Sequence, residues 1–185
     1  MVRPPDLACR PVEHVPALPA EVQREVEHRR LRAVGLAQGR VLDLAAAEAR
    51  AELAAVINGA SVTDRYDLIV SGAELTRFPD LRSALQAIVA LLAPAGVVEV
   101  IEPVNHVCVG HTLLATLWAR HPAVAGRALE RDLPAAMRAV GLTLWDLERF
   151  TVPTLVWPLR EMVHVRARIV RAMDEKASER AGTAA

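Results

Sequence analysis

The residues with the clearest capacity for acid–base chemistry lie in one short stretch, directly after an apolar run that predicts a strand. Glu102, Asn105, His106 and His111 follow the run Gly96–Ile101. Open α/β sheets bind ligands at the carboxyl ends of their strands, and a carboxylate or imidazole placed there can act as a general base. Glu102, His106 and His111 are therefore the candidate catalytic residues. His106 and His111 fit a polar loop and the start of a helix more readily than a catalytic role.

No other ionisable or thiol groups have the spacing of a second site. Neither cysteine, Cys9 or Cys108, has the His/Asp setting of a nucleophile. No set of histidines, cysteines or carboxylates has the spacing of a metal site, so no metal is expected. The four other histidines are scattered along the chain: His14, His28, His121 and His164.

Two further features favour structural roles over chemistry. The run Arg24–Arg32 is strongly charged, but its signs alternate, which indicates a solvated helix face. The tryptophans are expected to anchor a core or an interface rather than to stack on nucleic-acid bases. They are Trp118, Trp145 and Trp157.

Strands alternating with helices must position these residues. Apolar runs predict five strands: Arg40–Leu44, Tyr66–Ser71, Val97–Ile101, Leu142–Phe150 and Met162–Val170. Helical patterns cover Ala20–Val34, Ala45–Ile57, Leu81–Leu92, Val107–Arg120 and Leu133–Val140, with Asp80 and Asp132 as N-terminal caps. The alternation predicts right-handed crossovers, a mostly parallel sheet and a three-layer α/β fold.

Length and charge restrict the class of protein. The chain has 185 residues, which predicts a single domain, and its 22 basic and 22 acidic residues give no net charge. Neutrality argues against nucleic acid as a partner. No apolar run is long enough to span a membrane, and two cysteines fit a reducing cytoplasm. The expected organisation is a proline-rich arm over residues 1–19, a domain over 20–171 and a polar tail over 172–185.

Five stretches, in the same order, resemble class I S-adenosylmethionine-dependent methyltransferases that act on small molecules. Val41–Ala49 (VLDLAAAEA) lies where that family has V-L-D-L-G-x-G-x-G, and Tyr66–Ser71 (YDLIVS) is similar to its F-D-L-V-x-S strand. The segment Leu91–Gly96 (LLAPAG) is close to L-L-K-P-G-G, and Ala139–Leu142 and Val163–Ala167 resemble the segments around the last two strands. The resemblance implies a Rossmann-like sheet of about five strands, in the spatial order first, second, third, fifth, fourth, with the fifth antiparallel.

The first of these stretches departs from the family at the cofactor loop. The resemblance assigns this loop to Asp43, Ala45, Ala47 and Ala49, where three alanines replace three glycines. Each alanine adds a Cβ where the family's backbone turns tightly beside the cofactor, and Glu48 adds a negative charge. We therefore expect a degenerate loop, with Asp43 as an anchor of the loop more readily than a ligand.

The chain is also too short for the family's full sheet. Only 21 residues separate Leu44 from Tyr66, and a single crossover already needs a dozen or more. The family's second strand, with the acid that binds the ribose hydroxyls, is therefore expected to be missing. Glu52 or Asp64 could replace that acid, but the spacing favours neither.

These departures favour a non-catalytic subunit of a heteromeric small-molecule methyltransferase, with no cofactor in the isolated chain. The first strand becomes an open sheet edge, and Leu53, Val56 and Ile57 of the next helix lose their usual neighbour. An intact methyltransferase subunit or a second copy of the chain is the expected partner. The alternatives are an active S-adenosylmethionine-dependent O- or N-methyltransferase and a small-molecule binding protein that uses the old substrate pocket near His106 and His111.

Overall fold

The computed structural model describes residues 12, 15–104, 121–129 and 131–169. Several expectations therefore lie outside the described residues. They are the roles of Asn105, His106 and His111, the helix over Val107–Arg120, most of the proline-rich arm and the polar tail.

The described strands form one five-stranded sheet in the order β1-β2-β3-β5-β4. The strands are β1 (Val41–Asp43), β2 (Tyr66–Gly72), β3 (Leu92–Pro103), β4 (Leu142–Thr151) and β5 (Glu161–Ile169). β1, β2 and β3 pair in parallel, whereas β5 is antiparallel to both β3 and β4. The predicted strands, their spatial order and the reversed fifth strand are confirmed. No strand lies between β1 and β2, as the short spacing predicts.

Helices connect these strands at the expected places. They are α1 (Ala20–Leu36), α2 (Ala47–Ile57), α3 (Leu81–Leu91) and α5 (Leu133–Ala139), with the 3₁₀ turns η1 (Leu75–Arg77) and η2 (Trp157–Leu159). Asp80 caps α3 by accepting from Arg82 N and Ser83 N, and Asp132 caps α5 by accepting from Ala135 N. Helix α1 continues through Gly35, where an end was expected. None of the helices in the described part of the chain has both the length and the apolar character needed to cross a bilayer.

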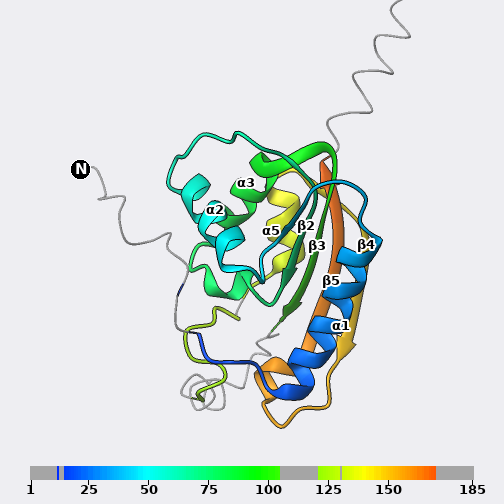
Figure 1. Ribbon diagram of the computed structural model, residues 1–185. Helices are drawn as coiled ribbons and strands as arrows, with labels where there is room; N and C mark the ends of the chain where they lie inside the picture. Colours follow the sequence, from blue (N-terminus) through cyan, green and yellow to red (C-terminus); the bar gives the residue numbers. More distant parts are fainter. Residues whose placement is uncertain (1–11, 13–14, 105–120, 130, 170–185) are drawn as a thin grey trace, which may run out of the picture.

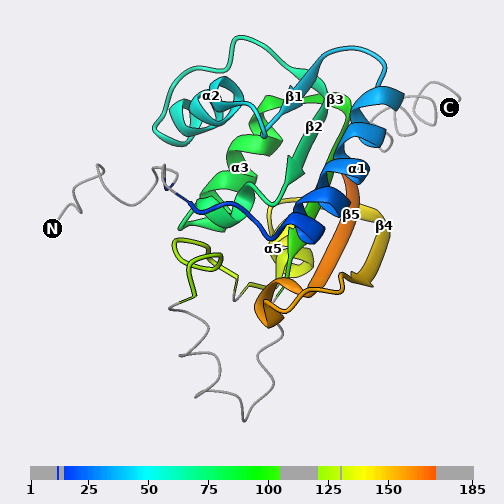
Figure 2. The same cartoon turned by 60° about the horizontal axis from the view of Figure 1, so that its bottom comes forward.

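The helices lie in two layers, one on each face of the sheet (Figures 1 and 2). The steps from β1 to β2 and from β2 to β3 run in the same direction across the sheet. Right-handed crossovers therefore place α2 and α3 on one face, and α5 joins them there. Helix α1 covers the other face, where Val22 and Val26 pack against Val70 and Ile101. The three-layer α/β prediction is confirmed.

The larger core lies between the sheet and the face with α2, α3 and α5. Leu53 of α2 belongs to this core and has no exposed surface, while Val56 and Ile57 are half-buried against it. The expectation that Leu53 faces outward in an apolar patch is therefore wrong. Helix α2 does not need a missing neighbour, because its crossover direction brings it against α3.

Candidate functional site

The carboxyl ends of β1, β2 and β3 meet at one edge of the sheet, which is where open α/β sheets bind ligands. Asp43 ends β1, Ser71 lies at the end of β2 and Glu102 lies at the end of β3. Four arginines from other elements reach the same edge: Arg30, Arg50, Arg127 and Arg131. We call these seven residues the carboxyl-end cluster.

Asp43 is held on both of its oxygens. Its Oδ1 accepts from the backbone N–H of Ala45 at 3.0 Å, and its Oδ2 is paired with the guanidinium of Arg30 from α1. Arg30 also pairs with Glu27, one turn earlier on the same helix. The carboxylate of Asp43 therefore joins the end of β1 to α1 and to the loop that follows.

Arg50, on α2, contacts the loop that follows β1. Its guanidinium donates to the carbonyl oxygens of Leu44 and Ala45, at 2.8 and 2.7 Å, and lies 3.4 Å from the carboxylate of Glu74. Arginine can satisfy two carbonyls at once because its planar group offers five N–H donors. Two carbonyl groups of this loop are therefore hydrogen-bonded to the side chain of Arg50.

The three alanines of the predicted cofactor loop have different surroundings. Ala45 and Ala47 are exposed, whereas Ala49 lies on the buried face of α2 and belongs to the main core. None of the three has a positive φ, since Ala73 at 63° is the single such non-glycine residue in the described part of the chain. The loop enters α2 without the left-handed turn that a glycine would permit.

Glu102 is the most unusual group of the cluster, because it is a carboxyl buried at the end of a central strand. Its Oε1 accepts from Ser71 Oγ at 2.6 Å and from the backbone N–H of Leu75 at 2.9 Å. Its Oε2 has no hydrogen-bond partner within the described residues. Burial raises the pKa of Glu102 to about 7, against the smaller lowering effects of these two hydrogen bonds. Glu102 can therefore hold or release a proton near neutral pH.

A small cavity lies beside Glu102 among the described residues. It has a volume of about 20 Å³ between η1 and the start of α5, roughly the room for one water molecule. Arg131 narrows it by donating to the carbonyl oxygens of Leu75 at 3.2 Å and of Phe78.

Arg127 also forms hydrogen bonds with the segment between β2 and α3. It donates to Ala73 O at 3.3 Å, to Thr76 Oγ1 at 3.1 Å and to Pro16 O at 2.8 Å. Burial lowers the pKa of the Arg127 and Arg131 guanidinium groups, as expected for charges removed from water. These arginines bind backbone carbonyls, so they position the connection between β2 and α3.

Sequence reasoning identified only part of this cluster. It singled out Asp43 and Glu102, but it interpreted the run that contains Arg29 and Arg30 as a solvated helix face. That interpretation is wrong for both residues, whose side chains are only 20% and 12% exposed. Arg50, Arg127 and Arg131 were not predicted at all, because nothing local marks an arginine whose partners lie far along the chain.

The two acids considered as replacements for the family's ribose-binding residue have other partners. Glu52 accepts from the hydroxyl of Tyr66 at 2.8 and 2.9 Å, and Asp64 pairs with Arg40 at 2.7 Å. Within the described residues, no three histidine, cysteine or acidic side chains are grouped so that they could hold a metal ion.

Comparison with known proteins gives a match at the level of structure only. No protein-family model matches the sequence, and no curated protein matches it. Among solved structures, the N-methyltransferase NodS from Bradyrhizobium japonicum, in complex with S-adenosylhomocysteine, has a TM-score of 0.54 and 14% identity. The match covers 86% of this chain and 91% of that one. A putative methyltransferase from Bacillus halodurans has a TM-score of 0.56 and 11% identity, over 78% of this chain and 98% of that one.

This chain has the class I methyltransferase fold. A third similar structure is the 1,6-didemethyltoxoflavin-N1-methyltransferase of Burkholderia thailandensis, with bound S-adenosylhomocysteine, at a TM-score of 0.50 and 18% identity. That match covers 81% of this chain and 78% of the other. Identities this low carry the fold and no activity. Within the methyltransferase fold, Arg30 and Arg50 therefore engage the loop that the resemblance assigns to the cofactor.

Proposed function

We propose that this methyltransferase-fold chain does not bind S-adenosylmethionine by itself, and that it works as a non-catalytic subunit of a heteromeric small-molecule methyltransferase. One observation carries the proposal. The loop after β1 has its carbonyl groups engaged by Arg50 and its acid engaged by Arg30.

These contacts compete directly with a cofactor at the same place. A ligand at this loop would have to displace charge-assisted hydrogen bonds, which are about twice as strong as neutral ones. It would also meet the Cβ atoms of Ala45 and Ala47, which glycines would not present. The residues present therefore do not fit the cofactor, and we derive no methyl-transfer step for this chain alone.

A partner would be expected at the β1 side of the sheet. β1 pairs only with β2 among the described strands, so one edge of it is unpaired. The residues that follow, Ala45–Glu48, are exposed. An open strand edge is a ready template for another chain. An intact methyltransferase subunit is the first candidate, and a second copy of this chain is the other.

Reconstitution tests the subunit role. The full chain would be isolated from its own cells with its stable partner, and the partner's methyl transfer would be measured with and without the chain. We expect the partner to be an intact methyltransferase whose rate or thermal stability falls when the chain is withheld. A chain that stays monomeric in light scattering, and transfers methyl groups alone, contradicts the proposal.

Glu102 favours the alternative of an active methyltransferase that acts on a small molecule. A buried carboxyl with a pKa of about 7, one of whose oxygens has no hydrogen-bond partner among the described residues, has the properties of a general base. This alternative requires S-adenosylmethionine binding, and it requires methyl transfer to fail in Glu102→Gln while cofactor binding persists. A small-molecule binding protein using the pocket near His106 and His111 would bind its ligand without any transfer.

We place this function in the cytoplasm. The proposal depends on the small number of cysteines, Cys9 and Cys108, which suits a reducing compartment. Fractionation of the native cells would test it directly, since recovery of the chain outside the cytoplasm would contradict it.

A further inference from the structure

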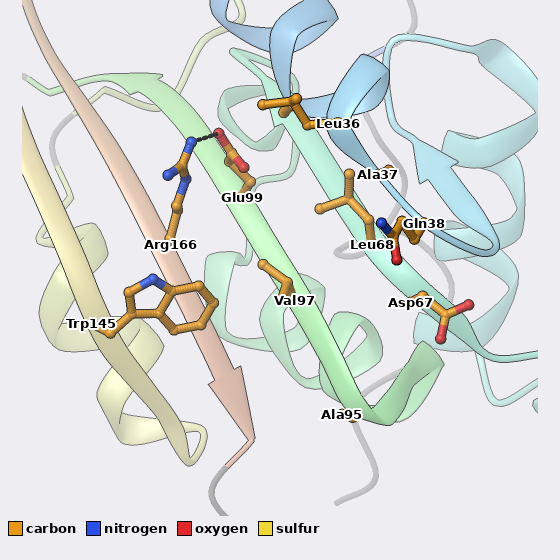
Figure 3. Close-up of a pocket in the computed structure, with 11 residues that line it drawn as sticks. Leu36, Ala37, Gln38, Asp67, Leu68, Ala95, Val97, Glu99, Trp145 and Arg166 are labelled. Atoms are coloured by element: carbon orange, nitrogen blue, oxygen red, sulfur yellow. Dashed lines mark hydrogen bonds and ion pairs between the residues drawn. The ribbon is translucent and has the colours of Figure 1, made fainter.

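A groove lies at the opposite end of the sheet from the carboxyl-end cluster, between α1 and the starts of β2 and β3 (Figure 3). Its volume is about 490 Å³, within the usual range for small-molecule sites. Apolar side chains make up most of its surface: Ala33, Leu36, Ala37, Leu68, Ala95 and Val97. No residue of the carboxyl-end cluster reaches it.

A β-bulge aims an exposed tryptophan into this groove. The pairing of β4 with β5 shifts register between Leu144 and Asp146, which leaves Trp145 as the extra residue. Leu144 packs against the main core, whereas Trp145 and Asp146 both face the α1 side of the sheet. Bulges re-aim side chains in this way and are common beside functional sites. Trp145 is 47% exposed, so of the two roles expected for the tryptophans, anchor of a core or of an interface, the core role does not apply to it.

A buried carboxylate lies on the groove floor. Glu99 of β3 is 5% exposed, and its Oε1 contacts His164 at 2.6 Å and Arg166 at 3.2 Å. Burial opposes ionisation of Glu99, but the hydrogen bonds from His164 and Arg166 outweigh it and lower the pKa of this carboxyl. Figure 3 shows Arg166 on one side of Glu99, with the second carboxylate oxygen turned away from it.

The charge around the groove is negative. A polar extension of about 360 Å³ continues it along α1 and shares Glu99 and Arg166 with it. Together the two parts are lined by five carboxylates and three guanidinium groups. The guanidinium of Arg168, 5.7 Å from the centroid of the Trp145 ring, adds a fourth positive charge. This leaves an excess of one negative charge when His28 and His164 are neutral. The carboxylates are Glu25, Asp67, Glu99, Asp146 and Glu148.

From this geometry we infer that the groove binds a small organic cation, a protonated or quaternary amine attached to a flat apolar body. The apolar body lies over Leu68 and Val97. The cation lies between the carboxylate of Glu99 and the face of Trp145 that the guanidinium of Arg168 does not cover. Cations are attracted to the faces of indole rings, and an excess of carboxylates selects them over anions. The inference is independent of the proposed function, because it uses none of the same residues.

Three probes of matched shape test the inference on the full chain by titration calorimetry. They are 2-phenylethylamine, 2-phenylethanol and 3-phenylpropionate, which carry a positive, a zero and a negative charge. We expect saturable binding of the amine at millimolar concentrations, with affinity falling in the order amine, alcohol, acid. Binding of the acid or the alcohol as tightly as the amine would overturn the inference, as would the absence of saturable amine binding.

Two variants locate the binding. Trp145→Ala should weaken amine binding by about tenfold, since the cation loses the indole face. Trp145 lies on an exposed strand, so this change leaves the core intact. Glu99→Gln should weaken amine binding several-fold and leave binding of the alcohol unchanged. Leu155→Ala is the control, because Leu155 is 94% exposed and lies outside the groove. Unchanged amine affinity in Trp145→Ala would refute the site.

Discussion

Replacement of Glu102 by glutamine should remove a strong pH dependence from the stability of this chain. Burial raises the pKa of Glu102 from its ordinary 4.5 to about 7. Between these two values the unfolded chain ionises this carboxyl while the native chain keeps it protonated. The unfolded state then binds fewer protons, so the free energy of unfolding falls as pH rises through this window. A pKa difference of about 2.5 corresponds to roughly 3 kcal/mol.

Glutamine keeps an oxygen that can accept the hydrogen bonds from Ser71 Oγ and Leu75 N, but its side chain cannot ionise. Its buried amide costs stability at every pH, whereas the penalty for ionising Glu102 grows only as pH rises. Urea unfolding of both proteins, from about pH 4.5 to about pH 8, should show the wild type losing roughly 3 kcal/mol relative to the variant. Glu48→Gln, which removes an exposed carboxylate, is the matched control. A difference between wild type and Glu102→Gln that stays constant with pH would refute the reasoning.

Three further changes test how the chain holds its loops and core. Arg50→Ala should lower the free energy of unfolding by about 2 kcal/mol in urea, because it frees two loop carbonyls; an unchanged midpoint would mean that Arg50 does not hold the loop. Leu53→Arg should unfold the chain in a thermal melt, and Leu53→Ala should cost about 3 kcal/mol, because Leu53 is fully buried. Gly39→Ala should destabilise more than Gly59→Ala. Both glycines have positive φ, but only the Cβ added at Gly39 would meet Asp67, at 2.2 Å, so equal losses would contradict this.

The fold could be predicted from the sequence because its determinants are local. β2 (Tyr66–Gly72) contains a continuous apolar run, β5 alternates apolar and polar residues, and Asp80 marks the start of α3 by its position alone. The short spacing between Leu44 and Tyr66 correctly excluded further strands. The position of Leu53 could also have been derived, since the crossover direction alone places α2 against α3.

The candidate site was less accessible, because its contacts join distant parts of the chain. Arg127 reaches back to Pro16 and Ala73, and Arg30 reaches forward to Asp43. On a sequence, such arginines are indistinguishable from those on a solvated helix face. The groove at Trp145 depends on a one-residue bulge, and a regular two-residue alternation gives no sign of it.

Titration calorimetry of the isolated full chain with S-adenosylmethionine, and in parallel with S-adenosylhomocysteine, tests the central claim most directly. Because Arg50 and Arg30 of the same chain bind the loop after β1, we expect no saturable heat of binding for either compound at millimolar concentrations. A dissociation constant in the micromolar range would contradict the claim, because it would show that the contacts of Arg30 and Arg50 with this loop do not prevent cofactor binding.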